Sequence, residues 1–455
     1  MKSLKICLLG FVFISFFYHC ISKGQQQNLP KTVPVTESQP ILAVTGFGVD
    51  LENISKDSLK DLYQTGQIYV WKDLKNQTDS LFGGDRAKIV SDLKSFIPLS
   101  KNNILLTDLK HLSNQLRALS IDSIFFFHQP EKYPYYTLGS KSFDFKGQIT
   151  KFMLTGVTAI TRNTGKMADA HGTDFIIEGV RNYFQDSDFV HISNEVSFYD
   201  NCDYNYFVPN VYRFCSKERD FEALKKLNAN IVELTGNHNR DFGDDGYRKT
   251  FAWYQKNGMQ TFGGGLSPEQ ANTPLIITLK DGKKMAFIGF NETCPCAECA
   301  ITPTQVGANK YDREKARKVI QKLKTIDQVD LVFASVQFTE VDSYSPTATQ
   351  DQISKDMIDF GADVVYGSQA HQVQKIEFYK GKPIFHGLGN FLFDQIHRIG
   401  VKQGYFLENY LYEGKLIQSV PIFTMISANR RPEIATPEEE KEIRKIVFED
   451  HLIYK

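Results

Sequence analysis

Residues suited to acid–base or metal chemistry gather between Asn237 and Asp241, directly after a short apolar run that ends at Gly236. Asn237 offers a neutral oxygen to a hard cation, and His238 can bind a metal or exchange a proton with a reacting oxygen. Asp241 is spaced to orient that imidazole or to cap the next helix. We predict that Asn237 binds a metal and that His238 and Asp241 act in catalysis. A capped turn around a hydrogen-bonded histidine is the alternative.

Two carboxylates follow other apolar runs. Asn194 and Glu195 end the run that starts at Phe189. A carboxylate in that place is costly to bury unless a cation or hydrogen bonds meet it. We therefore predict Glu195 as a metal ligand and Asn194 as a neutral contact for substrate. Glu340 follows the run 331–336 and is predicted to be catalytic, as a base or a second carboxylate ligand, with a surface position as the alternative.

A third group of polar residues follows the later runs. Gln369 and His371 are two residues apart on an extended segment, which presents both side chains to the same face. The glycines before Asn390 permit a tight backbone path near a ligand. We predict His371 as a metal ligand, and Gln337, Gln369 and Asn390 as neutral contacts for substrate.

These motifs need elements that place them together. From about residue 150, short apolar runs that end in glycine or small polar residues alternate with helical stretches. The runs begin at Lys151, Phe189, Ile231, Met285, Leu331, Val364 and Pro383, and the helical stretches span 221–227, 246–256 and 312–323. This alternation predicts a layered α/β domain. Ligands of such folds meet the loops at the carboxyl ends of the strands, where the polar motifs lie.

Taken in order, these motifs resemble the CapA family of poly-γ-glutamate capsule proteins, which is related in architecture to the calcineurin-like metallophosphatases. The resemblance spans residues from about 151 to 425 and is closest in the string Leu-Gly-Asn-Phe-x-Phe-Asp-Gln, which ends at Gln395. It implies a metallophosphatase-like layered domain that acts in capsule or cell-envelope polymer synthesis, as a metal-dependent hydrolase or transferase.

The chain departs from the family pattern at three positions. Val157 stands where the family usually has a metal-binding Asp, and Gln337 and Gln369 stand where it usually has His. The remaining candidates support one divalent metal ion better than two, and they are equally compatible with none. Arg162 can instead contribute to a rim that binds a carboxylate or phosphate of the substrate.

Two functions are compatible with this altered pattern. One is an exported CapA-like enzyme that acts on a γ-glutamyl or related polymer, or on a phosphate or amide ester. The other is a non-catalytic binding or scaffold protein, in which a degenerate metal site holds an anionic polymer or a sugar. The 53 basic and 53 acidic residues balance, so no global field is expected to recruit nucleic acid.

The amino terminus predicts export. Lys2 and Lys5 precede an apolar run from Ile6 to Tyr18, so residues 1–20 have the pattern of a signal peptide. Cys20 is either lipidated as the first mature residue or lost by plain cleavage. A lipid at Cys20 would tether the protein to a membrane at the periplasmic or cell surface.

Three further regions are predicted. Residues 21–40 are a linker, 41–148 form a small α/β module before the CapA-like domain at 149–425, and 426–455 form a charged helical tail. A stretch of the small module that contains Trp71-Lys-Asp-Leu resembles part of the phosphate-type periplasmic solute-binding proteins. The module is too short to be a complete two-lobed binding protein.

Cysteines of an exported protein favour disulfides. Cys202 and Cys215 bracket a loop rich in Tyr and Asn, and we predict that they pair. Cys294, Cys296 and Cys299 resemble a metal knuckle only superficially, because no fourth zinc ligand is evident nearby.

Overall fold

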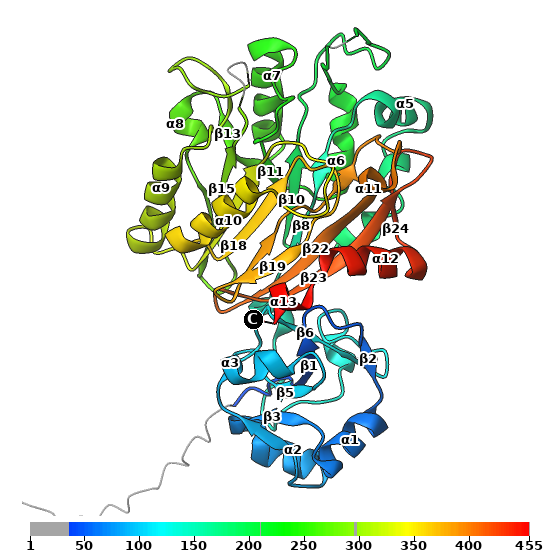
Figure 1. Cartoon of the computed structure of the whole chain (residues 1–455), viewed down its shortest axis with the longest axis vertical. Helices are drawn as coiled ribbons and strands as arrows, with labels where there is room; N and C mark the ends of the chain where they lie inside the picture. The colour runs from blue at the N-terminus through cyan, green and yellow to red at the C-terminus, as the bar shows by residue number, and fades with distance from the viewer. Residues whose placement is uncertain (1–35, 210, 295–297, 455) are drawn as a thin grey trace, which may run out of the picture.

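The computed structural model describes residues 36–209, 211–294 and 298–454, so the predicted leader and most of the predicted linker lie outside it. A small module and a larger domain lie one below the other in Figure 1, with the carboxyl terminus at their junction. The predicted layered α/β domain preceded by a small α/β module is confirmed. Within the described ranges, every helix is too short or too polar to cross a bilayer.

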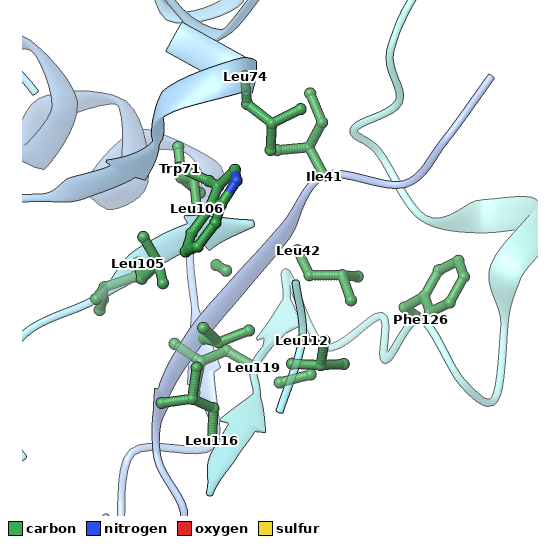
Figure 2. Packing of buried hydrophobic residues seen from close by; sticks show 14 of the residues in the cluster. Ile41, Leu42, Trp71, Leu74, Leu105, Leu106, Leu112, Leu116, Leu119 and Phe126 are labelled. Atoms are coloured by element: carbon green, nitrogen blue, oxygen red, sulfur yellow. The ribbon is translucent and has the colours of Figure 1, made fainter. Parts of the chain in front are cut away.

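The small module is built on a five-stranded sheet with the order β4-β3-β5-β1-β6. These strands are β1 (Leu42–Gly46), β3 (Tyr69–Trp71), β4 (Lys88–Val90), β5 (Leu105–Thr107) and β6 (Leu116–Ala118). Helix α1 (Lys56–Thr65) begins after Ser55, whose side chain accepts a hydrogen bond from the first turn. Leu42 of β1 and Trp71 of β3 belong to the same apolar core, part of which Figure 2 shows.

The larger domain contains two large sheets, with the main strand orders β12-β11-β10-β8-β22-β23-β24 and β14-β15-β17-β18-β20-β19. The first has nine strands, which are β8 (Thr150–Leu154), β9 (Val157–Thr158), β10 (Phe189–Asn194), β11 (Ile231–Glu233), β12 (Gln260–Phe262), β21 (Asn390–Leu392), β22 (Gln403–Tyr412), β23 (Lys415–Ile426) and β24 (Pro432–Ile434), with β9 paired to β10 and β21 off the main path. The second consists of β14 (Leu275–Thr278), β15 (Lys284–Asn291), β17 (Leu331–Gln337), β18 (Val364–Ser368), β19 (Ile376–Tyr379) and β20 (Lys382–Phe385). Strands β8, β10, β11 and β12 are parallel, as are β15, β17, β18 and β20. The carboxyl ends of each parallel set therefore share one edge.

Side-chain alternation along the strands builds the layers. Phe152 of β8 packs between the sheets, with its ring centroid 5.3 Å from those of Phe287 and Phe333. The next residue, Met153, faces the other way and packs with helix α7 (Gly243–Lys256). The outer face of the second sheet is covered by α9 (Arg313–Thr325) and α10 (Ala348–Phe360). The two sheets are thus enclosed between helical layers (Figure 1).

The long hairpin of β22 and β23, which the sequence did not predict, joins the two units. Tyr410 of β22 belongs to the core of the small module and stacks on Phe127 at 4.4 Å between ring centroids. Gln418 of β23 accepts a 2.8 Å hydrogen bond from the backbone of Ala118. The small module therefore shares its core with strands that also belong to the larger domain.

The carboxyl-terminal segment, predicted as a charged helical tail, contains strand β24 and helix α12 (Pro437–Val447). Thr436 caps the helix and forms a capping box with Glu439. Ile443 and Val447 on its inner face are buried in the same apolar cluster as the strands of both sheets. The segment is therefore part of the packed domain.

Candidate functional site

Glu195 is the most unusual side chain at the carboxyl edge of the first sheet. It follows β10 directly, and its backbone N–H donates a 2.8 Å bond to Thr158 of β9 (Val157–Thr158). The residue is 3% exposed, yet neither carboxylate oxygen has a hydrogen-bond partner in the described chain. A Cβ at Gly236 would lie 2.6 Å from Cα of Glu195, so only glycine permits this close approach. A buried carboxylate without partners is costly and requires a cation, a proton or water.

His238 lies in the turn after β11, next to the strand that carries Glu195. Its Nδ1–H donates to Oδ2 of Asp241 at 2.7 Å, which leaves Nε2 outside that bond. Burial by itself lowers the pKa of His238, but the hydrogen bond to Asp241 and the charge of Glu195 outweigh it and raise the pKa. The structure therefore brings together three of the predicted site residues.

Glu298 is a further carboxylate at this place, and the sequence did not reveal it. It lies on the loop between β15 and β16 (Gly307–Ala308), which a disulfide between Cys294 and Cys299 closes. Its Oε2 is buried and has no hydrogen-bond partner in the described chain. Glu298 follows no apolar strand, so its position in the sequence carries no signal of a site.

The charges of His238, Asp241 and Glu195 affect the pKa of Glu298. Burial raises the pKa of Glu298 to about 7; His238 opposes the rise, and the carboxylates of Asp241 and Glu195 add to it. We call Glu195, His238, Asp241 and Glu298 the acidic cluster. It contains three carboxyl groups and one imidazole, so it is built to attract a cation or a proton donor.

Gln337 links this edge to the second sheet. Its Nε2 donates to Oδ1 of Asn237 at 2.9 Å and to Oε1 of Gln369 at 2.7 Å. The three predicted residues therefore lie together. Both acceptor oxygens face an amide donor, and this bond competes with any cation for the oxygen of Asn237, the predicted metal ligand.

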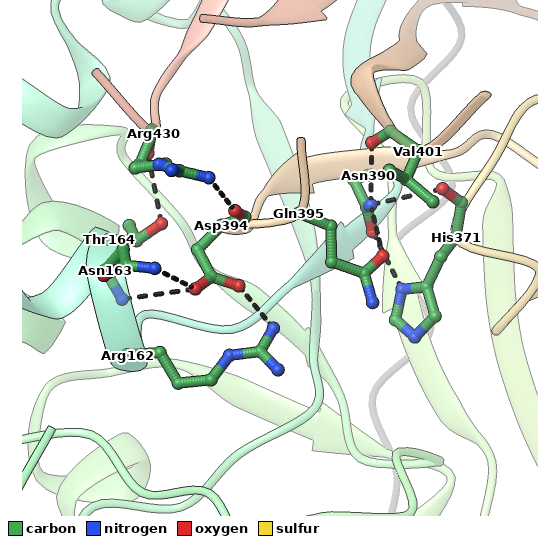
Figure 3. A network of polar contacts seen from close by, with 9 residues as sticks. All are labelled: Arg162, Asn163, Thr164, His371, Asn390, Asp394, Gln395, Val401 and Arg430. Carbon is green, nitrogen blue, oxygen red and sulfur yellow. Dashed lines mark hydrogen bonds and ion pairs between the residues drawn. The ribbon is translucent and has the colours of Figure 1, made fainter. Parts of the chain in front are cut away.

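His371 is held by Asn390, the first residue of β21 (Asn390–Leu392), as Figure 3 shows. Nδ1–H of His371 donates to Oδ1 of Asn390 at 2.8 Å, and Nδ2 of Asn390 donates to the carbonyls of His371 at 3.1 Å and Val401 at 3.0 Å. The amide of Asn390 thus positions His371, and a contact of Asn390 with substrate stays a prediction. Nε2 of His371 remains the atom able to bind a cation or exchange a proton.

Arg162, the first residue of α5 (Arg162–His171), forms an ion pair with Asp394 (Figure 3). The backbone and side chain of Asn163 each donate a 3.2 Å bond to the same carboxylate. The guanidinium also lies over the ring of Phe214, 4.5 Å from its centroid. Asp394 therefore already offsets the charge of Arg162, and the anion-binding role of Arg162 stays a prediction.

Two other predicted residues lie apart from this group. Asn194 is 1% exposed, and its Nδ2 donates to the carbonyl of Val196 at 2.6 Å and to the hydroxyl of Tyr254 at 2.7 Å. Its Nδ2 therefore ties β10 to helix α7. Glu340 is exposed beyond β17. The substrate role of Asn194 and the catalytic role of Glu340 stay predictions.

A buried hydrogen bond between His191 and Glu233 lies beneath the edge. Nε2 of His191 lies 3.0 Å from Oε2 of Glu233, whose Oε1 accepts bonds from Thr235 at 2.6 Å and Ser335 at 2.7 Å. Burial raises the pKa of Glu233, but His191 and these hydroxyls outweigh burial, so the net pKa is lowered. A cavity of about 10 Å³, the size of one water, separates Glu233 from His371.

A compact set of possible metal ligands lies elsewhere in the domain. Asp351, Glu377 and His386 are the only three His, Cys, Asp or Glu residues in the described chain whose ligand atoms all lie within 4.8 Å of one another. Lys355 is ion-paired to both carboxylates of this set, at 2.8 Å to Asp351 and 3.2 Å to Glu377. The lysine offsets part of their charge, so this set is a salt-bridge network in the described chain.

Cys202 and Cys215 form a disulfide with 5.8 Å between their Cα atoms. The disulfide closes a loop that leads directly to Phe214. The backbone N–H of Phe214 donates a 2.6 Å bond to Asp241, and its ring centroid lies 4.5 Å from that of His238. The loop therefore forms one wall beside the acidic cluster.

Comparisons with known proteins support the resemblance to capsule synthesis proteins that the sequence motifs indicated. The chain is 26% identical to the capsule biosynthesis protein CapA of Bacillus anthracis over 53% of this chain and 59% of that protein. It is 28% identical to the PGA biosynthesis protein CapA of Bacillus subtilis over 51% of this chain and 60% of that protein. The chain thus spans about three fifths of the length of these two relatives.

An ABC-type phosphate transport receptor from Vibrio cholerae aligns with 22% of this chain and 54% of its own, at 11% identity and a TM-score of 0.19. That score is too low to support the resemblance predicted for the small module, which stays a prediction. The model of the family described as bacterial capsule synthesis protein PGA_cap matches residues 151–395, more than half of the chain and the part that holds the acidic cluster. The protein therefore belongs to the PGA_cap family of bacterial capsule synthesis proteins.

Proposed function

We propose that this protein is an exported, cation-dependent hydrolase or transferase that acts on a poly-γ-glutamate-like capsule or cell-envelope polymer. Membership of the PGA_cap family supports the polymer, since relatives in this family carry names for capsule and poly-γ-glutamate synthesis. The acidic cluster supports a cation-dependent hydrolysis or transfer reaction. The signal-peptide pattern before Cys20 supports export.

One observation carries the cation dependence. Glu195 is buried with two unpaired oxygens, and a divalent cation would satisfy both the charge and the lone pairs. Asn237 and His371 are the other residues that would hold it, through Oδ1 and Nε2. The amide of Gln337 occupies the neighbouring oxygens, which favours one cation over two.

The residues of this chain supply the proton chemistry. A bound divalent cation would polarise a carbonyl or phosphoryl oxygen of the substrate. His238 exchanges a proton at Nε2, because Nδ1 is held by Asp241. Its raised pKa increases the protonated fraction, which suits donation to the leaving group. Asp241 keeps the imidazole in the required tautomer and orientation.

Metal analysis tests this proposal. The purified protein is loaded with Mn²⁺, Mg²⁺ or Zn²⁺ and dialysed, its metal content is measured, and hydrolysis of γ-glutamyl peptides and phosphoesters is followed. We expect about one ion per chain, with loss of the ion in Glu195→Gln and loss of hydrolysis alone in His238→Ala. Glu222→Gln, an exposed residue of the same domain paired only with Lys225, is the matched control. A protein that folds and binds none of the three ions would refute cation dependence.

A second candidate function is non-catalytic binding of a sugar-containing polymer. The loop closed by the disulfide between Cys202 and Cys215 contains Phe207, which is 81% exposed, and Tyr212, which is 74% exposed. Exposed aromatic groups of this kind mark interaction sites. If the protein is a binding protein, Phe207→Ser with Tyr212→Ser weakens polymer binding in a cosedimentation assay while Glu195→Gln does not. The enzyme proposal expects Glu195→Gln to abolish hydrolysis.

Export and anchoring are tested in cells. We expect the full chain in the envelope fraction, released from membranes by Cys20→Ser if Cys20 carries the lipid. Retention of the full chain in the cytoplasm would contradict export.

A further inference from the structure

Arg162 has an unusual backbone conformation and a buried partner. It begins helix α5 with a φ of 47°, in the left-handed region that residues other than glycine adopt rarely and at a cost in free energy. Its guanidinium forms an ion pair with Asp394, and Asn163 donates two 3.2 Å bonds to the same carboxylate (Figure 3). Asp394 is buried, and its carbonyl accepts a 2.9 Å bond from Arg430. The guanidinium is therefore held by an anchor that is itself fixed.

Two phenylalanine rings lie against this guanidinium. Its central carbon, Cζ, is 4.5 Å from the ring centroid of Phe214 and 5.1 Å from that of Phe393. Cation–π contacts extend to about 6 Å, so both rings are in contact with the charge. Arginine suits this place better than lysine, because a planar guanidinium can stack on aromatic rings while an ammonium is a compact point charge.

Each of the two rings also contacts a histidine of the site. The ring centroid of Phe393 lies 4.9 Å from that of His371, with 29° between the ring planes. The ring centroid of Phe214 lies 4.5 Å from that of His238, with 64° between the planes. Five side chains therefore form a continuous row, which we call the ring row. Its order is His238, Phe214, Arg162, Phe393 and His371.

The ring row completes the restraint on each imidazole. Nδ1–H of His238 is bonded to Asp241 at 2.7 Å, and the same carboxylate accepts a 2.6 Å bond from the backbone N–H of Phe214. Nδ1–H of His371 is bonded to Asn390 at 2.8 Å. A single hydrogen bond fixes one atom of an imidazole and still allows the ring to rotate about that bond. A packed aromatic ring blocks this rotation, so the direction of Nε2 depends on the ring beside it.

The chain segments that carry the two rings are tied to the same stretch of backbone. The N–H of Ala159 donates a 2.8 Å bond to the carbonyl of the residue directly before Phe393. The carbonyl of Ile160 accepts a 2.6 Å bond from the hydroxyl of Ser216, two residues after Phe214. Both rings are therefore held beside the segment that leads into helix α5.

We propose that Arg162 is a positioning residue, which orients the imidazoles of His238 and His371 through the rings of Phe214 and Phe393. The inference rests on the proposed function, in which His238 exchanges a proton and His371 holds the cation. It gives Arg162 a role other than holding an anionic group of the substrate. The left-handed backbone of Arg162 is the conformation that places its guanidinium between the two rings.

NMR spectra of the ion-free protein, labelled with ¹³C in histidine, test the geometry without any substrate. A displaced aromatic ring changes the ring current at the neighbouring imidazole and so shifts its signals. Arg162→Lys keeps the positive charge and removes the planar group, and it touches neither imidazole directly. We expect Arg162→Lys to shift the imidazole signals of both His238 and His371. Arg181→Lys is the matched control, because Arg181 is in the same domain and pairs with the exposed Asp174 at 2.9 Å.

Two further variants test each half of the ring row. Phe393→Leu should shift the signals of His371 most and those of His238 less, because the loss of one ring loosens the guanidinium that supports the other. Phe214→Leu should show the reverse pattern. Phe214→Tyr, which keeps an aromatic ring at a half-buried position, should restore most of the wild-type spectrum.

Kinetics on γ-glutamyl peptides separate positioning from substrate binding. For a positioning residue, Arg162→Lys should lower kcat about tenfold or more and change KM by less than about twofold. Phe393→Leu should have the same effect, although Phe393 carries no charge. A rise in KM alone in Arg162→Lys would mean that Arg162 binds the substrate and would refute the positioning role.

The outcomes distinguish this inference from the proposed function. If the His238 and His371 signals of Arg162→Lys coincide with those of the wild type, the positioning role is refuted even if the protein hydrolyses its substrate. If the wild type hydrolyses none of the substrates, the proposed function fails, while a joint shift of the two imidazole signals still supports the ring row. Should Arg162→Lys unfold the protein, Phe393→Leu must still shift the signals of His238, which Phe393 acts on only through Arg162.

Discussion

The side-chain amide of Gln337 donates a 2.9 Å hydrogen bond to Oδ1 of Asn237. Gln337 stands where a histidine ligand is usual in the family that the sequence resembles, and it also binds Oε1 of Gln369. The amide of Gln337 is thus a donor shared by two neighbouring side-chain oxygens. The second-sheet half of the edge is satisfied internally, while the acidic cluster on the first-sheet half is not.

Gln337→Leu should destabilise the protein by about 1–3 kcal/mol, because the buried oxygen of Gln369 and the partly buried oxygen of Asn237 lose their donor. The free energy of unfolding is measured by urea denaturation. Gln337→Glu should cost at least as much at neutral pH, since a carboxylate would face two oxygen acceptors. If Gln337→Leu is as stable as the wild type, the amide bridge does not contribute to folding.

Glu233→Ala should destabilise the protein by about 3–5 kcal/mol, because it leaves His191 and two hydroxyls without their buried partner. Glu233→Gln keeps the shape and some hydrogen bonds, so its loss should be smaller. Both are compared with Glu222→Gln, an exposed control expected within about 0.5 kcal/mol of wild type. Equal stability of Glu233→Ala and the control would show that the buried pair is not needed for folding.

Acid should weaken the contact between the small module and β22. Burial raises the pKa of Glu408, but the hydrogen bond from His128 at 2.8 Å and the charge of Lys151 at 3.0 Å lower it to below its usual 4.5. A lowered folded-state pKa stabilises the fold above the unfolded pKa, and this contribution is lost as pH falls below about 4.5. Unfolding free energies between pH 3 and pH 7 should therefore fall less steeply in Glu408→Gln than in wild type.

A wild type and a Glu408→Gln variant with parallel pH profiles would contradict this assignment. The comparison is needed because other carboxylates also titrate in the same range.

Asp241→Asn should lower the pKa of His238, because the hydrogen bond and the charge of Asp241, which both raise it, are removed. The shift is measured from the imidazole resonances in an NMR titration of the ion-free protein. Asp244→Asn is the control, since Asp244 bonds to Arg240 and not to the imidazole. An unchanged pKa of His238 in Asp241→Asn would show that the pair has no electrostatic role.

Most strands of the parallel sheets could be predicted from the sequence, because they follow local patterns of apolar and small polar residues. The predicted strands that begin near Lys151, Phe189, Ile231, Met285, Leu331, Val364 and Pro383 correspond to β8, β10, β11, β15, β17, β18 and β20. Short apolar runs that end in small polar residues are a local signal, and the glycine before each turn adds to it. The hairpin of β22 and β23 was missed, because its strands mix polar and apolar residues in a segment that is buried by both units.

The sequence by itself determined which residues are near the carboxyl edges of the strands, and so it identified Glu195, His238, Asp241 and His371. Only the tertiary structure decided which contacts each candidate side chain makes, because its hydrogen-bond and ion-pair partners come from distant segments of the chain. Asp394 neutralises Arg162, and the backbone of Val196 with the hydroxyl of Tyr254 engages the amide of Asn194.

Glu298 shows most clearly what the sequence alone could not predict. It is far from every strand-end motif in sequence, and a disulfide, Asn291 and the backbone of Ala308 bring it to the acidic cluster. Local patterns record which face a side chain takes, since that follows from backbone periodicity. They do not record which distant charges meet that side chain, and those charges shift its pKa.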